Sequence, residues 1–185
     1  MARHRVLGLA GGLLLILCPA SAGAATITHF EQVAPTPTLY LLGVDYVFFL
    51  PEQFVASGDV TALLELVPNV GLPADFAGFT PGNIALIERG TLLFTDKVNN
   101  AAAAGAAAVL VYNNIVGLSG VAFVGPTSIP ALFITQALGQ SLIAQLGSGP
   151  VEAHLAVDVI PEPATLLLLG SGLAAAGLRR RRPRA

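Results

Sequence analysis

The segment from Asn83 to Asn114 constrains the fold of this chain most, because it predicts two strands and a helix in a fixed order. Residues 84–87 form a short apolar run suited to a buried strand. Residues 94–104 have a composition typical of a helix and end in four alanines. Gly105 follows, and glycine allows the left-handed conformation that ends a helix. Residues 107–112 form the next predicted strand. Strand, helix and strand in this order predict a βαβ unit with parallel strands.

Further short elements are predicted on both sides of this unit. Hydrophobic residues make up 54% of the chain, but Gly and Pro interrupt them regularly, so the apolar runs have strand length. The segment TALLELV, at residues 61–67, fits either a strand or a helix. We expect one or two strands around Gly43 within 39–50, a strand at 131–134, a helix at 136–146 and a closing strand at 151–159. The predicted fold class is mixed α/β (α+β).

The first 25 residues have the three-part layout of a secretory signal peptide. A basic start precedes an apolar run at residues 6–17, and small residues follow at the expected cleavage site, namely Ala22, Ala24 and Ala25. The run is shorter than the roughly 20 residues that cross a bilayer. We therefore expect export by Sec-type machinery and cleavage after Ala24 or Ala25. An uncleaved anchor is the alternative.

Charge and cysteine content narrow the function classes for the rest of the chain. Cys18 is the only cysteine and lies in the predicted signal peptide, so we expect neither a disulfide nor a thiolate ligand in the mature chain. Between residues 26 and 160, two basic side chains, Arg89 and Lys97, stand against ten acidic ones, a formal charge of −8. Such a domain repels phosphate backbones, so we expect no nucleic-acid partner.

The C-terminal end combines an apolar segment with a basic tail. Residues 164–178 carry no charge, and the cluster Arg179, Arg180, Arg181 and Arg182 follows at once. Arginines beside an apolar segment indicate the cytoplasmic side, so we expect a transmembrane helix with a tail retained in the cytoplasm. A helix of this length reaches about 22 Å, less than the roughly 30 Å hydrocarbon core, which predicts a transient membrane anchor.

Pro161, Glu162 and Pro163 come immediately before this segment. The Pro-Glu-Pro triplet, the short apolar helix and the arginine cluster, in this order, resemble the PEP-CTERM sorting signal of bacteria that export extracellular polysaccharide. The resemblance implies that an exosortase, a membrane-embedded processing enzyme, recognises the triplet. It also implies an inner-membrane intermediate, followed by transfer to the cell surface or release outside the cell. A permanent anchor flanked by prolines is the alternative.

Residues 82–146 contain a distinctive set of features, namely the run at 84–87 with Arg89 and Gly90, the spacing of Phe94, Lys97 and Ala101, the triplets 104–106 and 112–114, and Ile129-Pro130 leading to Gly139. Together these features resemble a protease-associated (PA) domain. Leu92 stands where the family often has a cysteine. The resemblance implies a strand-rich sandwich or partial barrel flanked by two helices. We expect this domain to occupy residues 26–158 and the sorting signal to occupy 159–185.

In the PA family the domain is usually a non-catalytic module that binds peptides or proteins, or gates access to an active site. The resemblance therefore implies a protein that is not an enzyme and has no cofactor. Arg89 and Lys97 either anchor an acidic peptide or offset the local negative charge. Asn113 and Asn114 end a predicted strand, where polar side chains can meet a ligand. The loop at 113–126 is rich in small and apolar residues, and we expect ligand contact there.

Groups that could carry catalysis or hold a metal are few. Ser119 approaches a nucleophile elbow, but Val121 replaces the second glycine that this motif needs. His154 lies two residues from Glu152 on a predicted strand, where we expect a surface ion pair rather than a general base. His29 is expected in mobile chain near the mature N-terminus. The acidic residues show no D-x-D spacing, so neither a calcium site nor any other metal site is expected.

We therefore expect an exported, exosortase-processed surface or secreted protein with a non-catalytic PA domain. That domain would bind a protein, a peptide or the polysaccharide of the extracellular matrix. Two alternatives remain. One is a small secreted hydrolase whose catalytic residues converge only in the tertiary structure, and the other is a structural matrix component without a specific ligand.

Overall fold

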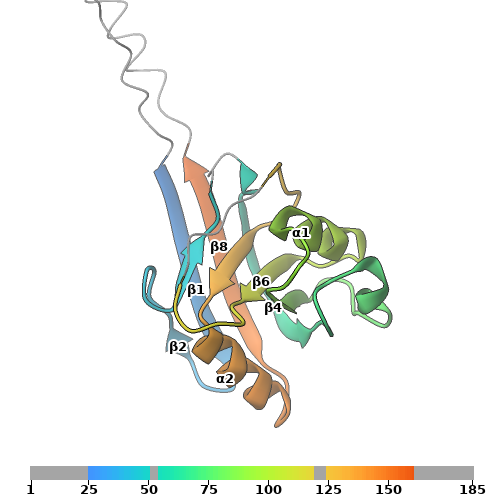
Figure 1. The fold of residues 1–185 in the computed structure, drawn as a ribbon. Helices are drawn as coiled ribbons and strands as arrows, with labels where there is room; N and C mark the ends of the chain where they lie inside the picture. Colours follow the sequence, from blue (N-terminus) through green and yellow to red (C-terminus); the bar gives the residue numbers. More distant parts are fainter. Residues whose placement is uncertain (1–24, 51–53, 119–123, 161–185) are drawn as a thin grey trace, which may run out of the picture.

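The computed structural model describes residues 25–50, 54–118 and 124–160. The described residues form one eight-stranded mixed sheet in the order β2-β1-β8-β4-β5-β6-β7-β3 (Figure 1). Strands β4 to β7 are parallel to one another, and the pairs at both ends of the sheet are antiparallel. The strands are β1 (Ala25–Ala34), β2 (Thr38–Leu39), β3 (Tyr46–Phe48), β4 (Gly58–Leu66), β5 (Ile84–Glu88), β6 (Ala108–Tyr112), β7 (Ala131–Ile134) and β8 (Glu152–Ile160).

The predicted βαβ unit is confirmed as β5, α1 (Phe94–Ala103) and β6. Gly105 has the left-handed φ of +88° expected after the helix, and a side chain there would also press against Pro81. The central strands are almost entirely apolar because elements cover both of their faces. Every residue of β7, and all but the last residue of β5 and of β6, is buried.

The other predicted elements also form. The ambiguous segment at 61–67 lies in strand β4 except for its last residue, and the region around Gly43 gives the two short strands β2 and β3. Helix α2 spans Gln136–Leu146 as predicted, and the hydroxyl of Thr135 caps it by accepting a hydrogen bond from the Leu138 N–H at 3.2 Å. A 3₁₀ helix, η2, spans Pro73–Phe76.

Strand β1 is the element that the sequence analysis missed, since we expected His29 to lie in mobile chain. β1 instead pairs along its length with β8, and it also carries the short strand β2. Its first residue, Ala25, lies opposite Ile160, the last residue of β8, so β1 begins beside the point where β8 ends, at one end of the sheet (Figure 1). The alternation of β1 is blurred because Gln32 is buried while Ile27 is exposed.

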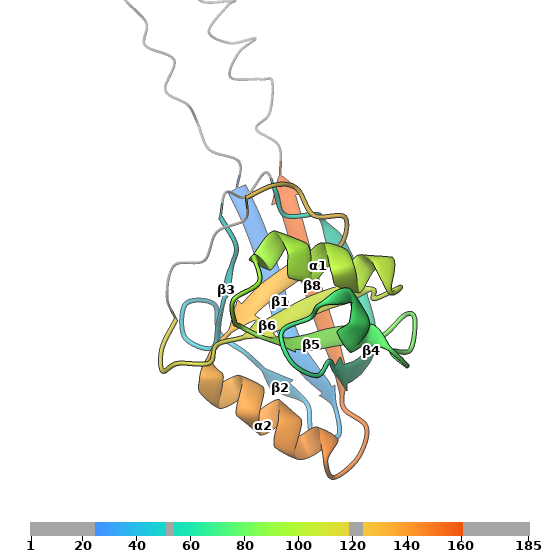
Figure 2. The same cartoon turned by 45° about the vertical axis from the view of Figure 1, so that its right-hand side comes forward.

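The sheet curls into a half-barrel, so that strands far apart in its order approach each other (Figure 2). The Tyr46 hydroxyl, on β3, donates a hydrogen bond to the carbonyl oxygen of Thr28, on β1, at 3.1 Å. The ring of Phe30 packs edge-on against Tyr46, with centroids 5.9 Å apart. Of the two predicted architectures, a sandwich or a partial barrel, the structure therefore shows the partial barrel.

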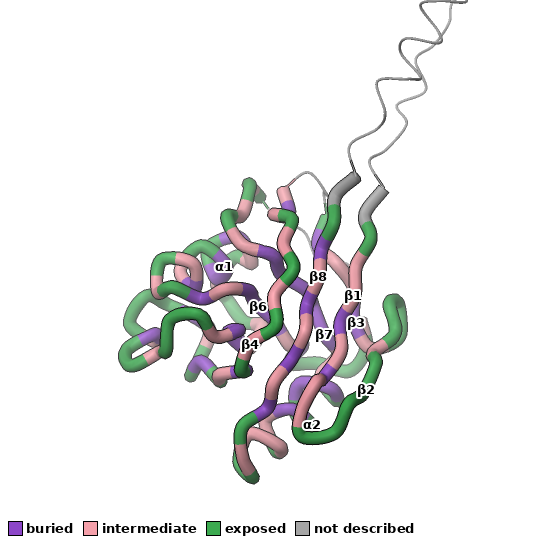
Figure 3. The backbone as a smooth tube through the Cα atoms, turned by 180° about the vertical axis from the view of Figure 1, so that it is seen from behind, coloured by how far each residue is buried: buried purple, intermediate pink, exposed green. Residues whose placement is uncertain are grey.

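Seen from behind, β8 and β1 alternate between buried and more exposed residues (Figure 3). One face of this antiparallel part covers the core, and the other is open to solvent. Among the described residues no helix has the length and apolar character to cross a membrane. The predicted transmembrane helix at 164–178 and the signal peptide helix lie outside the described residues.

Candidate functional site

The parallel strands bring two of the predicted ligand-contact residues, Arg89 and Asn113, to one edge of the sheet. Arg89 follows β5 and Asn113 follows β6, and Thr135, which was not predicted, follows β7. Because these strands are parallel, their carboxyl ends meet at the same edge, which is where parallel sheets of open α/β proteins bind ligands. Asp45 joins them from the start of β3, where its carbonyl oxygen accepts a hydrogen bond from the Thr135 N–H at 2.9 Å.

Asn113 organises this edge from a fully buried position. Its Oδ1 accepts a hydrogen bond from Arg89 Nη1 at 3.1 Å, and its Nδ2 donates to the carbonyl oxygen of Gly117 at 2.7 Å. Its backbone N–H donates to the carbonyl oxygen of Ile134 at 3.0 Å. The amide of Asn113 thus holds the loop after β6 in shape, while the neighbouring Asn114 is the residue exposed to solvent.

Exposed apolar side chains surround this edge, and we call them the apolar rim. Leu41, Leu42 and Val44 come from the loop between β2 and β3, and Ile115 and Val116 come from the loop after β6. Val116 is 92% exposed, and the other four are between 49% and 63% exposed. The two loops lie next to each other because Asp45 and Asn113 bind adjacent residues, Thr135 and Ile134 (Figure 2). Clustered exposed apolar side chains are typical of an interaction surface.

Lys97 does not take part in this surface, although the sequence suggested it as a peptide anchor or as an offset to nearby acidic groups. Its side chain is fully buried, and its Nζ donates hydrogen bonds to the carbonyl oxygens of Val70 and Glu88. Burial is the main reason why its pKa falls to about 8, while the negative charges of Glu88 and Asp75 act in the opposite direction. Lys97 therefore ties α1 to the segment before β5 and to the last residue of β5.

A surface hollow lies away from these residues, between α2 and the end of β1. Its volume is about 770 Å³, within the usual range for small-molecule sites. None of its lining residues is charged; they are Ala34, Pro35, Ser141, Ala144, Gln145, Ser148, Gly149 and Pro150. The hollow offers neither a charge nor a metal ligand, so we place the candidate site at the apolar rim.

A second group of polar side chains lies on the solvent face of the antiparallel part of the sheet. We expected His154 to pair with Glu152, but the structure places it between Glu31 of β1 and Asp59 of β4. Its Nδ1 lies 3.4 Å from Glu31 Oε1, and its Nε2 lies 2.8 Å from Asp59 Oδ1. The hydrogen bond to Asp59, followed by that to Glu31, raises the pKa of His154 above its ordinary value.

The remaining predicted site residues lie outside the described part of the chain. They are the sorting triplet Pro161, Glu162 and Pro163, the tail Arg179, Arg180, Arg181 and Arg182, the cleavage-site residues Ala22 and Ala24, and Ser119 with residues 120–123 of the predicted contact loop. Ala25, the other cleavage-site residue, begins β1. Cleavage after Ala24 would therefore leave the whole strand in the mature protein.

Comparison with family models assigns this curled mixed sheet with its βαβ unit to the PA domain. A family model of the PA domain matches residues 56–142, and a model of the PEP-CTERM protein-sorting motif matches residues 159–182. The chain therefore carries a PA domain followed by a PEP-CTERM sorting motif, as the sequence indicated. The sorting motif identifies an exported protein and implies processing by an exosortase. Strands β1 and β8 extend the sheet beyond the residues that match the PA model.

Several relatives are aminopeptidases. The chain is 43% identical over 108 residues to a probable leucine aminopeptidase 2 of Aspergillus fumigatus, covering 55% of this chain and 22% of that protein. It is 36% identical over 150 residues to an aminopeptidase of Pseudomonas aeruginosa, covering 70% of this chain and 26% of that protein. A solved aminopeptidase from Aneurinibacillus sp. strain AM-1 superposes with a TM-score of 0.61 at 31% identity, over 74% of this chain and 32% of that one.

These relatives overturn our expectation that the protein is not an enzyme. The proteins to which it is similar carry the names of peptidases, so the PA resemblance by itself gives no ground for excluding catalysis. The chain spans about a quarter of the length of these curated relatives and aligns with the PA part of them. The activity of the whole relatives is therefore considered below only as a proposal.

Proposed function

We propose that this exported protein captures polypeptide segments for a peptidase system outside the cytoplasm, and that the apolar rim is its binding surface. The carrying observation is the exposure of five apolar side chains around the carboxyl edge of the parallel strands. A chain segment with apolar side chains would bury this surface and gain about 25 cal/mol for each Å² removed from water. Arg89 supplies a positive charge near the rim, which favours a segment that also carries an acidic group.

The relatives support a polypeptide ligand rather than a small molecule. Peptidases act on polypeptides, and the PA part of such an enzyme is the part to which this chain is similar. The buried hydrogen bonds of Asn113 fix the loop that carries Ile115 and Val116. Binding would therefore cost little conformational entropy in this loop. We therefore favour polypeptide binding over attachment to polysaccharide.

Aminopeptidase activity is a second candidate, because the names of the relatives favour it. It is tested directly by incubating the full exported protein, purified from its host, with leucine p-nitroanilide. Release of p-nitroaniline that scales with protein concentration would support activity of this kind. If no p-nitroaniline is released and the same protein still binds polypeptide, capture remains the proposed function.

Polypeptide binding is tested with fluorescein-labelled casein, an unfolded chain, by fluorescence anisotropy. The double variant Ile115→Ser and Val116→Ser removes two rim side chains from an exposed loop, so the fold should survive. We expect at least tenfold weaker binding than for the wild-type protein. The matched control is Leu63→Ser, an exposed apolar residue of β4 outside the rim. Equal losses in both variants, or none in the double variant, would reject the rim as the binding surface.

A further inference from the structure

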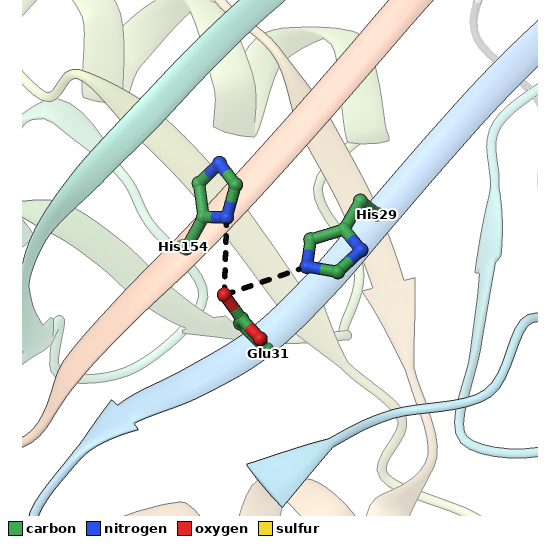
Figure 4. A group of neighbouring side chains, drawn as sticks. All are labelled: His29, Glu31 and His154. Atoms are coloured by element: carbon green, nitrogen blue, oxygen red, sulfur yellow. Dashed lines mark hydrogen bonds and ion pairs between the residues drawn. The ribbon is translucent and has the colours of Figure 1, made fainter. Parts of the chain in front are cut away.

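The outer face of β1, β8 and β4 gathers four potential metal ligands. His29 and Glu31 come from β1, His154 comes from β8, and Asp59 comes from β4. Glu31 Oε1 lies between two imidazole rings, 3.6 Å from Nε2 of His29 and 3.4 Å from Nδ1 of His154 (Figure 4). One ligand atom from each of His29, Glu31 and His154 lies within 4.8 Å of the other two.

These separations match those around a small cation. Two ligand atoms bound about 2.0–2.2 Å from a tetrahedral zinc ion lie roughly 3.3–3.6 Å apart. The two distances to Glu31 Oε1 fall at this spacing, while direct charge-assisted hydrogen bonds are shorter, about 2.7–2.9 Å. The rings of His29 and His154 face the same oxygen with centroids 5.1 Å apart, so only small side-chain rotations would bring all three ligands onto one ion.

Asp59 completes the arrangement from the other side of His154. Its Oδ1 lies 2.8 Å from Nε2, the ring nitrogen of His154 that points away from Glu31. A hydrogen bond donated by that nitrogen to Asp59 leaves the lone pair of Nδ1 directed at Glu31. Histidine ligands of metal ions are held in this way by a carboxylate that accepts a hydrogen bond from their second ring nitrogen.

The charge of this face also favours a cation. The carboxylates of Glu31, Asp59, Glu152 and Asp158 lie on the solvent side of these strands, as the alternation of β8 and β4 requires. Between residues 26 and 160 the only Lys and Arg residues are Arg89, which follows β5, and the buried Lys97. Neither lies on this face, so within the described residues no Lys or Arg side chain neutralises these carboxylates.

We propose that His29, Glu31 and His154 form a binding site for a divalent transition-metal ion, with Asp59 orienting His154. Two imidazoles and a carboxylate suit zinc, whereas calcium and magnesium prefer oxygen ligands alone. The side chains are 24–40% exposed, so an ion can enter from solvent and keep water in its remaining position. A bound ion would join β1 to β8, the strands that adjoin the predicted signal peptide and the sorting motif.

The test is zinc binding by the full exported protein, measured by isothermal titration calorimetry and checked by thermal unfolding with and without zinc. We expect one zinc ion per chain and a higher melting temperature in its presence. His29→Gln and Glu31→Gln remove a ligand from a half-exposed position, so these variants should fold, and we expect at least a tenfold loss of affinity in each. Asp59→Asn should weaken binding by about 10- to 100-fold, as loss of a carboxylate that holds a histidine ligand does.

Glu152→Gln is the matched control, since it removes a carboxylate from the same face of β8 without touching the three ligands. It should bind zinc within twofold of the wild-type protein. The cobalt(II) form adds a readout of geometry, because tetrahedral cobalt absorbs visible light far more strongly than hexa-aqua cobalt. The proposal is overturned if wild-type protein binds zinc no better than His29→Gln, or if Glu152→Gln loses as much affinity as Glu31→Gln. These outcomes do not depend on casein binding.

Discussion

Arg89 donates a hydrogen bond through Nη1 to Oδ1 of Asn113 at 3.1 Å, which joins the ends of two neighbouring parallel strands. Asn113 also contacts the loop after β6, because its Nδ2 donates a hydrogen bond to the carbonyl oxygen of Gly117. One buried amide therefore links the basic residue of the candidate site to the loop that carries Ile115 and Val116. The shape of the apolar rim depends on this link.

Replacing Asn113 with alanine should destabilise the protein by about 1–3 kcal/mol, because the Gly117 carbonyl oxygen would lose its hydrogen-bond donor in a partly buried position. Urea unfolding followed by circular dichroism measures this change in the free energy of unfolding. The control is Asn114→Ala, at the exposed neighbouring position, where we expect a change within about 0.5 kcal/mol. Similar costs for both variants would contradict the role of the buried amide.

Gly139 of α2 lies directly against Tyr112 of β6. A Cβ at position 139 would overlap the Tyr112 side chain, with its Cγ only 2.7 Å away. Gly→Ala inside a helix normally stabilises by about 1 kcal/mol. Here we expect the reverse, a loss of about 1–3 kcal/mol from overpacking between α2 and the sheet.

Thermal and urea unfolding of Gly139→Ala test this expectation. Gly149→Ala serves as the control, because a Cβ at that position meets no atom within 4 Å and its backbone is not left-handed. We expect the control to change stability by no more than about 0.5 kcal/mol. A stabilised Gly139→Ala protein would show that α2 can move away from β6 at little cost.

The buried Lys97 should make stability rise with pH in a defined window. Its pKa is about 8 in the folded protein against 10.5 as its ordinary value, so between these values the unfolded chain binds more protons than the folded one. Stability therefore increases as pH rises through this window. From pH 7.5 to 9.5 the expected gain from this side chain is about 2 kcal/mol.

The measurement compares urea unfolding of the wild-type protein and of Lys97→Met at pH 7.5 and 9.5. Subtracting the two pH dependences removes the contribution of all other groups. Measurements stay below pH 10 because burial raises the pKa values of Tyr40 and Tyr112, and a raised tyrosine pKa makes stability fall at higher pH. Equal pH dependences in the two proteins would mean that Lys97 remains charged and well solvated in the folded state.

Two-ended processing predicts a specific mass for the mature protein. Ala25 and Ile160 lie opposite each other at the ends of β1 and β8, so cleavage after Ala24 and cleavage beyond Ile160 would both leave the sheet intact. We expect the intact mass, measured in cell-envelope and culture fractions of the native host, to lack the first 24 or 25 residues. It should also lack the residues beyond 161–163. A mature product that keeps its arginine tail would indicate a permanent anchor instead.

Much of the fold could be predicted from local patterns. Helix α2 begins and ends at the predicted residues, and Gly105 adopts the left-handed conformation that its position after a run of alanines indicated. Such features depend on neighbours a few residues away, so the sequence contains them directly. The PA and PEP-CTERM resemblances were likewise carried by short runs of residues, and the family models match both.

The candidate sites were less predictable. Arg89 was singled out for its charge, and Asn113 and Asn114 because they end a predicted strand. The sequence did not show that the amide of Asn113 would be buried within its loop. The apolar residues of the loop between β2 and β3 were not linked to the contact loop at 113–126. Their proximity depends on β3 pairing with β7, which places them beside a loop some 70 positions away.

The sequence by itself determined the sorting motif, the βαβ unit and the acidic character of the domain, because these depend on composition and on residues close together in the chain. Only the tertiary structure decided that Lys97 is buried and that β1 belongs to the sheet. It also decided that His154 meets Glu31, a residue 123 positions away, instead of Glu152. The physical reason is strand register: the pairing of β1 with β8 and of β8 with β4 sets which side chains share a face, and that pairing is stabilised by the core as a whole.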